Sequence, residues 1–157
     1  MTTAACVCLT GRAGAGKRTI ATALVAELLQ RGLPAALLDE AGVKGRLVDG
    51  PDVLAWCCTL LTTNGVPTVV AVPVPSRDDR ELLRGSVPEF VEVFLDAPTE
   101  VCAERAGRSD DAYQTPYAPE LRVPTHGRDA AASAAQVLSF LEDRGVVAHD
   151  PRHPSEP

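Results

Sequence analysis

The chain has few aromatic residues, no long apolar run and no excess of basic residues, and each absence excludes a class of protein. Its 15 Lys and Arg are outnumbered by 21 Asp and Glu, which leaves a net charge of −6. A nucleic-acid-binding surface needs a basic face, so we expect no nucleic-acid partner. No apolar run approaches the roughly 20 residues of a membrane-spanning helix, and residues 1–4 lack the basic start of a signal peptide. We therefore expect no membrane partner.

The chain lacks the cysteine spacings of metal and disulfide sites, which indicates reduced thiols. The chain lacks the paired Cys-x-x-Cys spacing of zinc and redox sites, and its cysteines are odd in number: Cys6, Cys8, Cys57, Cys58 and Cys102. This pattern favours free thiols in the cytoplasm. Cys6 and Cys8 would share one face of a strand, and we interpret them as small core residues. No metal-ligating set is predicted.

What the chain does contain is a regular alternation of strand and helix patterns. Apolar β-type runs occur at 5–10, 34–39, 67–72 and 90–95, with a weaker one at 121–123, and helical patterns fill 17–31, 51–64, 77–84, 98–106 and 129–144. Nearly continuous apolar strands joined by helices predict an α/β fold whose parallel sheet is covered on both faces. Helical stretches that end at Gly32, Gly65, Gly85 and Gly145 predict left-handed stops. We expect one domain over 1–147 and a disordered tail over 148–157.

A glycine-rich turn that ends in a lysine follows the first predicted strand. It reads Gly11-Arg12-Ala13-Gly14-Ala15-Gly16-Lys17, and the order of strand, loop and helix is that of the Walker A phosphate loop. The glycines let backbone N–H groups converge, while the helix start and the lysine add positive charge. We predict an ATP site formed by Gly11, Gly14, Ala15, Gly16, Lys17, Arg18 and Thr19. Lys17 would reach the β- and γ-phosphates and Thr19 the α-phosphate.

Arg18 departs from this motif, which places a Mg²⁺-ligating Ser or Thr after the lysine. A guanidinium has no lone pair for a metal. Three alternatives follow. Mg²⁺ is held by phosphates and water alone, the guanidinium takes over part of its charge neutralisation, or Arg18 points to solvent and the nucleotide binds weakly.

Ligands of parallel sheets bind at the carboxyl ends of the strands, so the residues after each strand are candidates. Asp39 and Glu40 follow the second strand, where a carboxylate orients a hydroxyl nucleophile or holds Mg²⁺ through water. An equal alternative for Asp39 is a turn or helix-cap residue.

Three arginines form the remaining candidates. Arg77 and Arg80 lie three residues apart after Ser76, a predicted helix cap. They would grip an anionic substrate or pair with neighbouring acidic residues of the same helix. Arg105 begins a short polar stretch that reaches Tyr113. In nucleoside-phosphate kinases the corresponding region is a mobile lid whose basic residues fold over the phosphates.

Four segments together resemble the adenosine-5′-phosphosulfate (APS) kinase family. They are residues 9–21, 70–80, 90–105 and 116–121, and with the order of elements they cover most of 5–143. The resemblance implies a P-loop NTPase fold, a three-layer α/β/α sandwich with a five-stranded parallel sheet. It also implies ATP-dependent phosphorylation of the 3′-hydroxyl of APS and, as is usual in that family, a homodimer.

Several positions depart from the family pattern. The family's Asp-Gly-Asp-Asn-x-Arg aligns with residues 39–44, which places Ala41 at the catalytic carboxylate and Lys44 at the arginine. The APS-binding arginines of the next helix start have no counterpart at 49–53, although Arg77 matches the family, and most of the lid is deleted. Losing one such stabilising contact typically costs about 10²–10³ in rate.

We therefore expect an APS-kinase-like phosphotransferase of weak or altered activity, acting on APS or a related small anionic metabolite. Lys17, Asp39 and Glu40 are its candidate catalytic residues, and its candidate substrate-binding residues are Lys44, Arg77, Arg80 and Arg105. The alternatives are a kinase for an unrelated metabolite and an inactive pseudokinase that binds nucleotide or a partner protein.

Overall fold

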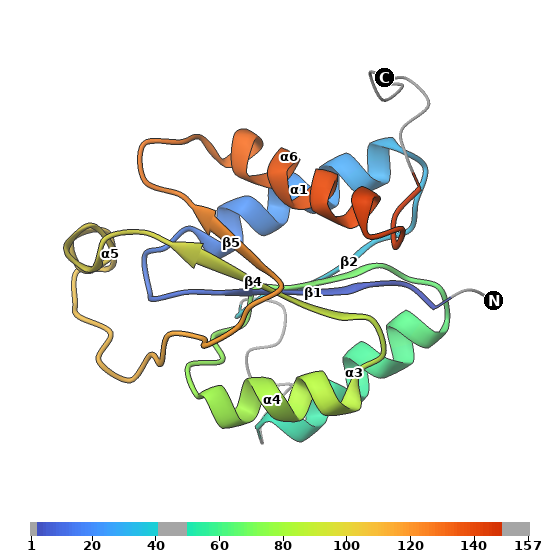
Figure 1. Ribbon diagram of the computed structural model, residues 1–157, viewed down its shortest axis with the longest axis horizontal. Helices are drawn as coiled ribbons and strands as arrows, with labels where there is room; N and C mark the ends of the chain where they lie inside the picture. Colours follow the sequence, from blue (N-terminus) through green and yellow to red (C-terminus); the bar gives the residue numbers. More distant parts are fainter. Residues whose placement is uncertain (1–2, 41–49, 149–157) are drawn as a thin grey trace.

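The computed structural model describes residues 3–40 and 50–148, and its sheet has five parallel strands. Lys44, Ala41 and the predicted tail from 149 onward lie outside the described residues. The strands pair in the order β2-β3-β1-β4-β5 (Figure 1). Their bounds are Cys6–Thr10 for β1, Ala36–Leu38 for β2, Thr68–Val70 for β3, Phe90–Asp96 for β4 and Leu121–Pro124 for β5. The predicted parallel sheet is confirmed.

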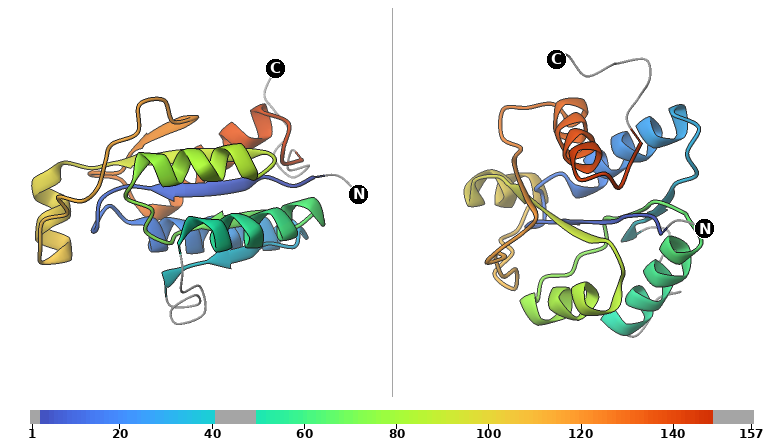
Figure 2. Two further views of the ribbon diagram at one scale, coloured as in Figure 1. Left: turned by 90° about the horizontal axis from the view of Figure 1, so that it is seen from below. Right: turned by 45° about the vertical axis from the view of Figure 1, so that its right-hand side comes forward.

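Helices cover both faces of this sheet. They are α1 (Lys17–Gln30), α3 (Pro51–Thr63), α4 (Arg77–Ser86), α5 (Thr99–Ala106) and α6 (Ala130–Asp143). Helices α1 and α6 pack together on one face and α3 and α4 on the other, and both views of Figure 2 agree with this arrangement. Helix α5 lies beyond the carboxyl end of β4 (Figure 1). None of the helices in the described residues is long and apolar enough to cross a membrane.

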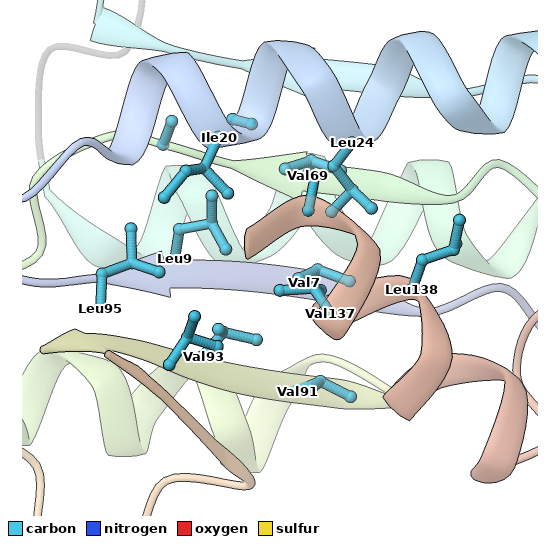
Figure 3. Packing of buried hydrophobic residues seen from close by; sticks show 14 of the residues in the cluster. Val7, Leu9, Ile20, Leu24, Val69, Val91, Val93, Leu95, Val137 and Leu138 are labelled. Carbon is cyan, nitrogen blue, oxygen red and sulfur yellow. The ribbon is translucent and has the colours of Figure 1, made fainter. Parts of the chain in front are cut away.

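Strand β1 divides its side chains between two cores, because successive residues of a strand point to opposite faces. Val7 and Leu9 pack with Ile20 and Leu24 of α1 under the α1–α6 layer (Figure 3). Cys6 and Cys8 face the other way and pack with Leu54, Cys58 and Leu83 under α3 and α4. The prediction that Cys6 and Cys8 are core residues is confirmed. Burial raises the pKa of the Cys8 thiol well above its usual range, which keeps it protonated.

Three of the four predicted glycine stops are confirmed. Gly32, Gly65 and Gly145 have φ of 76°, 79° and 76° and follow the last turns of α1, α3 and α6. Gly85 was predicted wrongly, because α4 continues through it to Ser86. The chain leaves α4 at Val87, which is extended and donates its N–H to the Leu83 carbonyl, so no left-handed residue is needed.

Candidate functional site

A cavity of about 850 Å³ lies at the carboxyl ends of β1, β2 and β3. Its volume is within the usual range for small-molecule sites. The phosphate loop forms one wall, Asp39 and Glu40 a second, and residues 73–75 and 108–113 the others. Most of the residues predicted to bind nucleotide or to act in catalysis line it, namely Gly11, Gly14, Gly16, Lys17, Arg18, Thr19, Asp39 and Glu40. The cavity therefore lies at the strand ends, where the sequence places these candidates.

The glycines of the loop are required by its geometry. Gly14 and Gly16 have φ of 86° and 100°, in the left-handed region that side chains rarely adopt. A Cβ on Gly14 would lie 2.3 Å from the Cys102 carbonyl oxygen of α5, so only a glycine lets helix and loop backbones meet. The Ala15 N–H donates to the Arg12 carbonyl at 3.0 Å and closes the turn. Helix α1 begins immediately afterwards, at Lys17, which directs its positive end at the cavity.

Lys17 lies across the loop rather than out in solvent. Its Nζ donates to the Gly11 carbonyl at 2.9 Å and to the Arg12 carbonyl at 3.0 Å. An ammonium has three donors, so one N–H remains for an anion on the loop. Burial lowers the pKa of Lys17, and the nearby Asp110 charge acts in the opposite direction. The half-buried ammonium is thus placed to bind phosphate.

Arg18 lies beside Asp39 in the same cavity. Its Nε is 3.6 Å from Asp39 Oδ2, and the two side chains are 73% and 15% exposed. The guanidinium therefore stands where the motif provides a metal-binding hydroxyl, and it faces a carboxylate that would otherwise approach the metal. This donor set does not fit the Mg²⁺ arrangement of the Walker motif, because a guanidinium offers no lone pair.

A carboxylate that the sequence did not predict sits on the rim of the loop. Asp110 Oδ2 accepts the Ala13 N–H at 2.8 Å, and Arg12 Nη1 donates to the Asp110 carbonyl at 2.8 Å. These two hydrogen bonds fasten the short segment after α5 to the phosphate loop. Nothing in the local sequence singles out Asp110 from Asp111, since the contact joins residues about a hundred positions apart. Its negative charge opposes the entry of another anion.

Arg80 has a structural role. This corrects the expectation that it binds substrate or forms an ion pair within its own helix. It is 1% exposed, and its Nε lies 2.8 Å from Glu92 Oε2 on β4. Its Nη1 donates to the carbonyls of Val74 (2.7 Å) and Pro75 (2.9 Å), and its Nη2 donates to the Gln114 carbonyl. With these protein acceptors around it, Arg80 fixes the wall of the cavity instead of contacting a ligand in it.

Arg77 also lies away from the main cavity. Its guanidinium stacks on Tyr117, 3.9 Å from the ring centroid, and donates to the Tyr117 hydroxyl at 2.9 Å and the Thr115 carbonyl at 2.6 Å. Ser76 caps this helix as predicted, because its Oγ accepts the Asp79 N–H at 3.4 Å. Arg77 thus ties the start of α4 to residues 115–117.

Arg105 lines a second, smaller cavity of about 390 Å³ on another side of the loop. This cavity shares Gly14, Gly16 and Thr19 with the larger one and is completed by Ala15, Ile20, Thr125, Arg128, Ala130 and Ser133. The sequence reasoning missed Thr125 and Arg128. Both follow β5, so the strand-end argument would have found them if it had been extended to the weak fifth strand.

Comparisons with known proteins agree on one family. The family model described as adenylylsulphate kinase matches residues 3–109. Adenylyl-sulfate kinases of Rippkaea orientalis and Gloeothece citriformis are 34% and 32% identical over 89% and 88% of this chain and 92% and 94% of their own lengths. The structure of a Mycobacterium tuberculosis APS kinase in complex with AMPPNP and APS is 28% identical, with a TM-score of 0.77 over 90% of this chain and 99% of that one. The chain therefore belongs to the adenylylsulphate kinase family.

Proposed function

We propose that this chain is an ATP-dependent phosphotransferase that acts on a hydroxyl of APS or a related small anionic metabolite, with weak or altered activity. The observation that carries the proposal is the phosphate loop, on which Lys17 and the start of α1 converge between two cavities. Family membership supports a kinase-like activity, and the M. tuberculosis relative binds an ATP analogue together with APS.

The two cavities suggest how the ligands divide. The polyphosphate would bind the loop amides, Lys17 and Thr19. The nucleoside would fill the smaller cavity beside Arg105, Thr125 and Arg128. In this arrangement Arg105 would contact the nucleotide and not, as the sequence suggested, the acceptor substrate. The acceptor would then occupy the larger cavity, where Asp39 and Glu40 are available.

In the proposed reaction, the acceptor's hydroxyl oxygen attacks the γ-phosphorus and the bond to ADP breaks. Asp39 or Glu40 accepts the hydroxyl proton, because these carboxylates line the acceptor cavity. Lys17 and the loop amides stabilise the charge that develops on the transferring and leaving groups. Lys44 stays a proposed substrate contact, and the homodimer and cytoplasmic location also stay predictions.

Asp110 favours a second candidate function, an inactive pseudokinase. Its carboxylate already accepts a hydrogen bond from the loop at Ala13, so a weakly bound or excluded nucleotide would leave the fold as an interaction module. The Ala41 substitution of the family's catalytic carboxylate points the same way.

The experiment that separates these functions compares turnover with binding. ADP release from ATP would be measured with APS and with a panel of hydroxyl-bearing anionic metabolites, beside calorimetric titration of ADP. We expect slow turnover with an anionic acceptor, loss of ADP binding in Lys17→Ala, and retained binding without turnover in Asp39→Asn combined with Glu40→Gln. ADP binding without turnover on any acceptor would favour the pseudokinase, and no ADP binding at all would contradict the nucleotide site.

A further inference from the structure

We infer that Arg18 takes the place of the divalent cation in this chain, so that nucleotide polyphosphate binds without Mg²⁺. The inference rests on the proposed nucleotide site and specifies how that site neutralises phosphate charge. The Arg18 guanidinium would neutralise the phosphate charge that Mg²⁺ neutralises in proteins with the usual Walker motif.

The position of Arg18 is the first argument. It follows Lys17 directly in the first turn of α1 and lines the main cavity together with Lys17 and Thr19. This is the position from which the Walker motif presents a hydroxyl to the metal. Since α1 begins at Lys17 as the motif requires, the replacement changes the chemistry at this position and leaves the backbone that presents it in place.

The partner of Arg18 is the second argument. Asp39 lies at the end of β2, and its Oδ2 is 3.6 Å from Arg18 Nε. A carboxylate beside a metal-binding hydroxyl would help to hold a hydrated cation. Here a guanidinium faces that carboxylate, so a second cation would meet a positive charge at the same place.

The exposure of the pair is the third argument. At 3.6 Å, with Arg18 73% exposed, the ion pair contributes little to stability. The guanidinium can therefore turn toward a phosphate at small cost. Arginine suits this role, because its planar set of N–H donors matches two phosphate oxygens at once.

The test is calorimetric titration of ADP into the whole chain, once in EDTA and once in Mg²⁺. For the unmodified protein we expect dissociation constants that agree within about twofold. In Arg18→Thr, which restores the hydroxyl of the motif, we expect binding in EDTA to weaken about tenfold and Mg²⁺ to recover most of the loss. A melting curve of each variant checks that it is folded.

Two further variants keep the test decisive. Arg108 lines the same cavity away from the motif position, so Arg108→Thr removes the same charge and should weaken binding equally in EDTA and Mg²⁺. If Arg18→Thr fails to fold, Arg18→Gln should weaken binding in EDTA with no recovery by Mg²⁺, because an amide is a poor substitute for the ligating hydroxyl.

The outcomes distinguish the inference from the function on which it rests. If the unmodified chain binds ADP only with Mg²⁺, the inference is overturned while the nucleotide site stands. If Arg18→Thr binds ADP as tightly as the unmodified chain in EDTA, Arg18 does not neutralise phosphate and the inference is also wrong. If ADP binds under neither condition, both the proposed function and the inference fail.

Discussion

Single residues decide how readily an anion reaches the phosphate loop. Lys17 and Arg18 bring positive charge to it, whereas Asp110 places a carboxylate 2.8 Å from the Ala13 N–H. An incoming phosphate must either displace this carboxylate or remain close to it. The charge at position 110 is therefore expected to set the affinity of the loop.

Asp110→Asn should strengthen binding of ADP and of pyrophosphate about tenfold, because it removes a like charge from the rim of the loop. Calorimetric titration measures this. Asp111→Asn is the matched control, since Asp111 is an exposed neighbour whose Oδ2 accepts a hydrogen bond from the Ser109 hydroxyl at 3.4 Å. It should leave the affinity nearly unchanged. Equal effects of the two variants would show that only overall charge matters.

Gly14 is a second residue whose identity is dictated by its surroundings. Gly14→Ala should lower the free energy of unfolding by about 3 kcal/mol or more, because the new Cβ meets the backbone of α5 and φ stays positive. Gly32→Ala has a similar φ of 76° and open space around it, so it should cost only about 1 kcal/mol. Urea unfolding of both variants checks this, and similar costs would mean that the α5 contact is not tight.

At the scale of elements, an ion-pair network joins α4 to the sheet. Glu92 of β4 is 2% exposed and forms an ion pair with Arg80 at 2.8 Å. It also accepts hydrogen bonds from Arg84 at 3.0 Å and from the Thr10 hydroxyl at 3.2 Å. Because Thr10 is the last residue before the phosphate loop, the network connects the base of the loop to the cavity wall that Arg80 holds.

Arg80→Met should destabilise the chain by about 3 kcal/mol, because it leaves the buried Glu92 carboxylate with Arg84 as its remaining ionic partner among the described residues. Arg77→Met, on the same helix but stacked on the largely exposed Tyr117, should cost less than about 1 kcal/mol. Chemical denaturation gives both values. A smaller loss for Arg80→Met than for Arg77→Met would contradict the structural role assigned to Arg80.

The elements themselves were predictable, whereas the pairings between distant side chains were not. Strand and helix positions follow from local periodicity, as with Ile20, Leu24 and Leu28 on α1. The phosphate loop followed from its spacing. The burial of Arg80 depends on Glu92, and the rim contact of Asp110 depends on Ala13. From sequence alone a charged residue is expected to be exposed unless its distant partner is known. The places of Arg80 and Asp110 therefore became clear only from the three-dimensional structure.

At the scale of the whole molecule, ligand binding should raise the free energy of unfolding. A ligand that binds only the folded chain raises the free energy of unfolding by about 2.7 kcal/mol at a hundredfold excess over its dissociation constant. We therefore expect ADP to raise the melting temperature in EDTA as well as in Mg²⁺, with Lys17→Ala showing neither shift. A rise seen only with Mg²⁺ would contradict the role inferred for Arg18, and an equal rise in Lys17→Ala would contradict the site described above.

The close approach of Gly14 to Cys102 has a consequence for two ligands bound together. Gly14, Gly16 and Thr19 border both cavities, so a single turn of chain is the partition between neighbouring chambers. Because the α5 backbone packs directly against Gly14, the loop cannot shift toward α5 when a ligand binds in one chamber. If donor and acceptor occupy these two chambers as proposed, any change that one makes in the affinity of the other must be matched by the same factor in return.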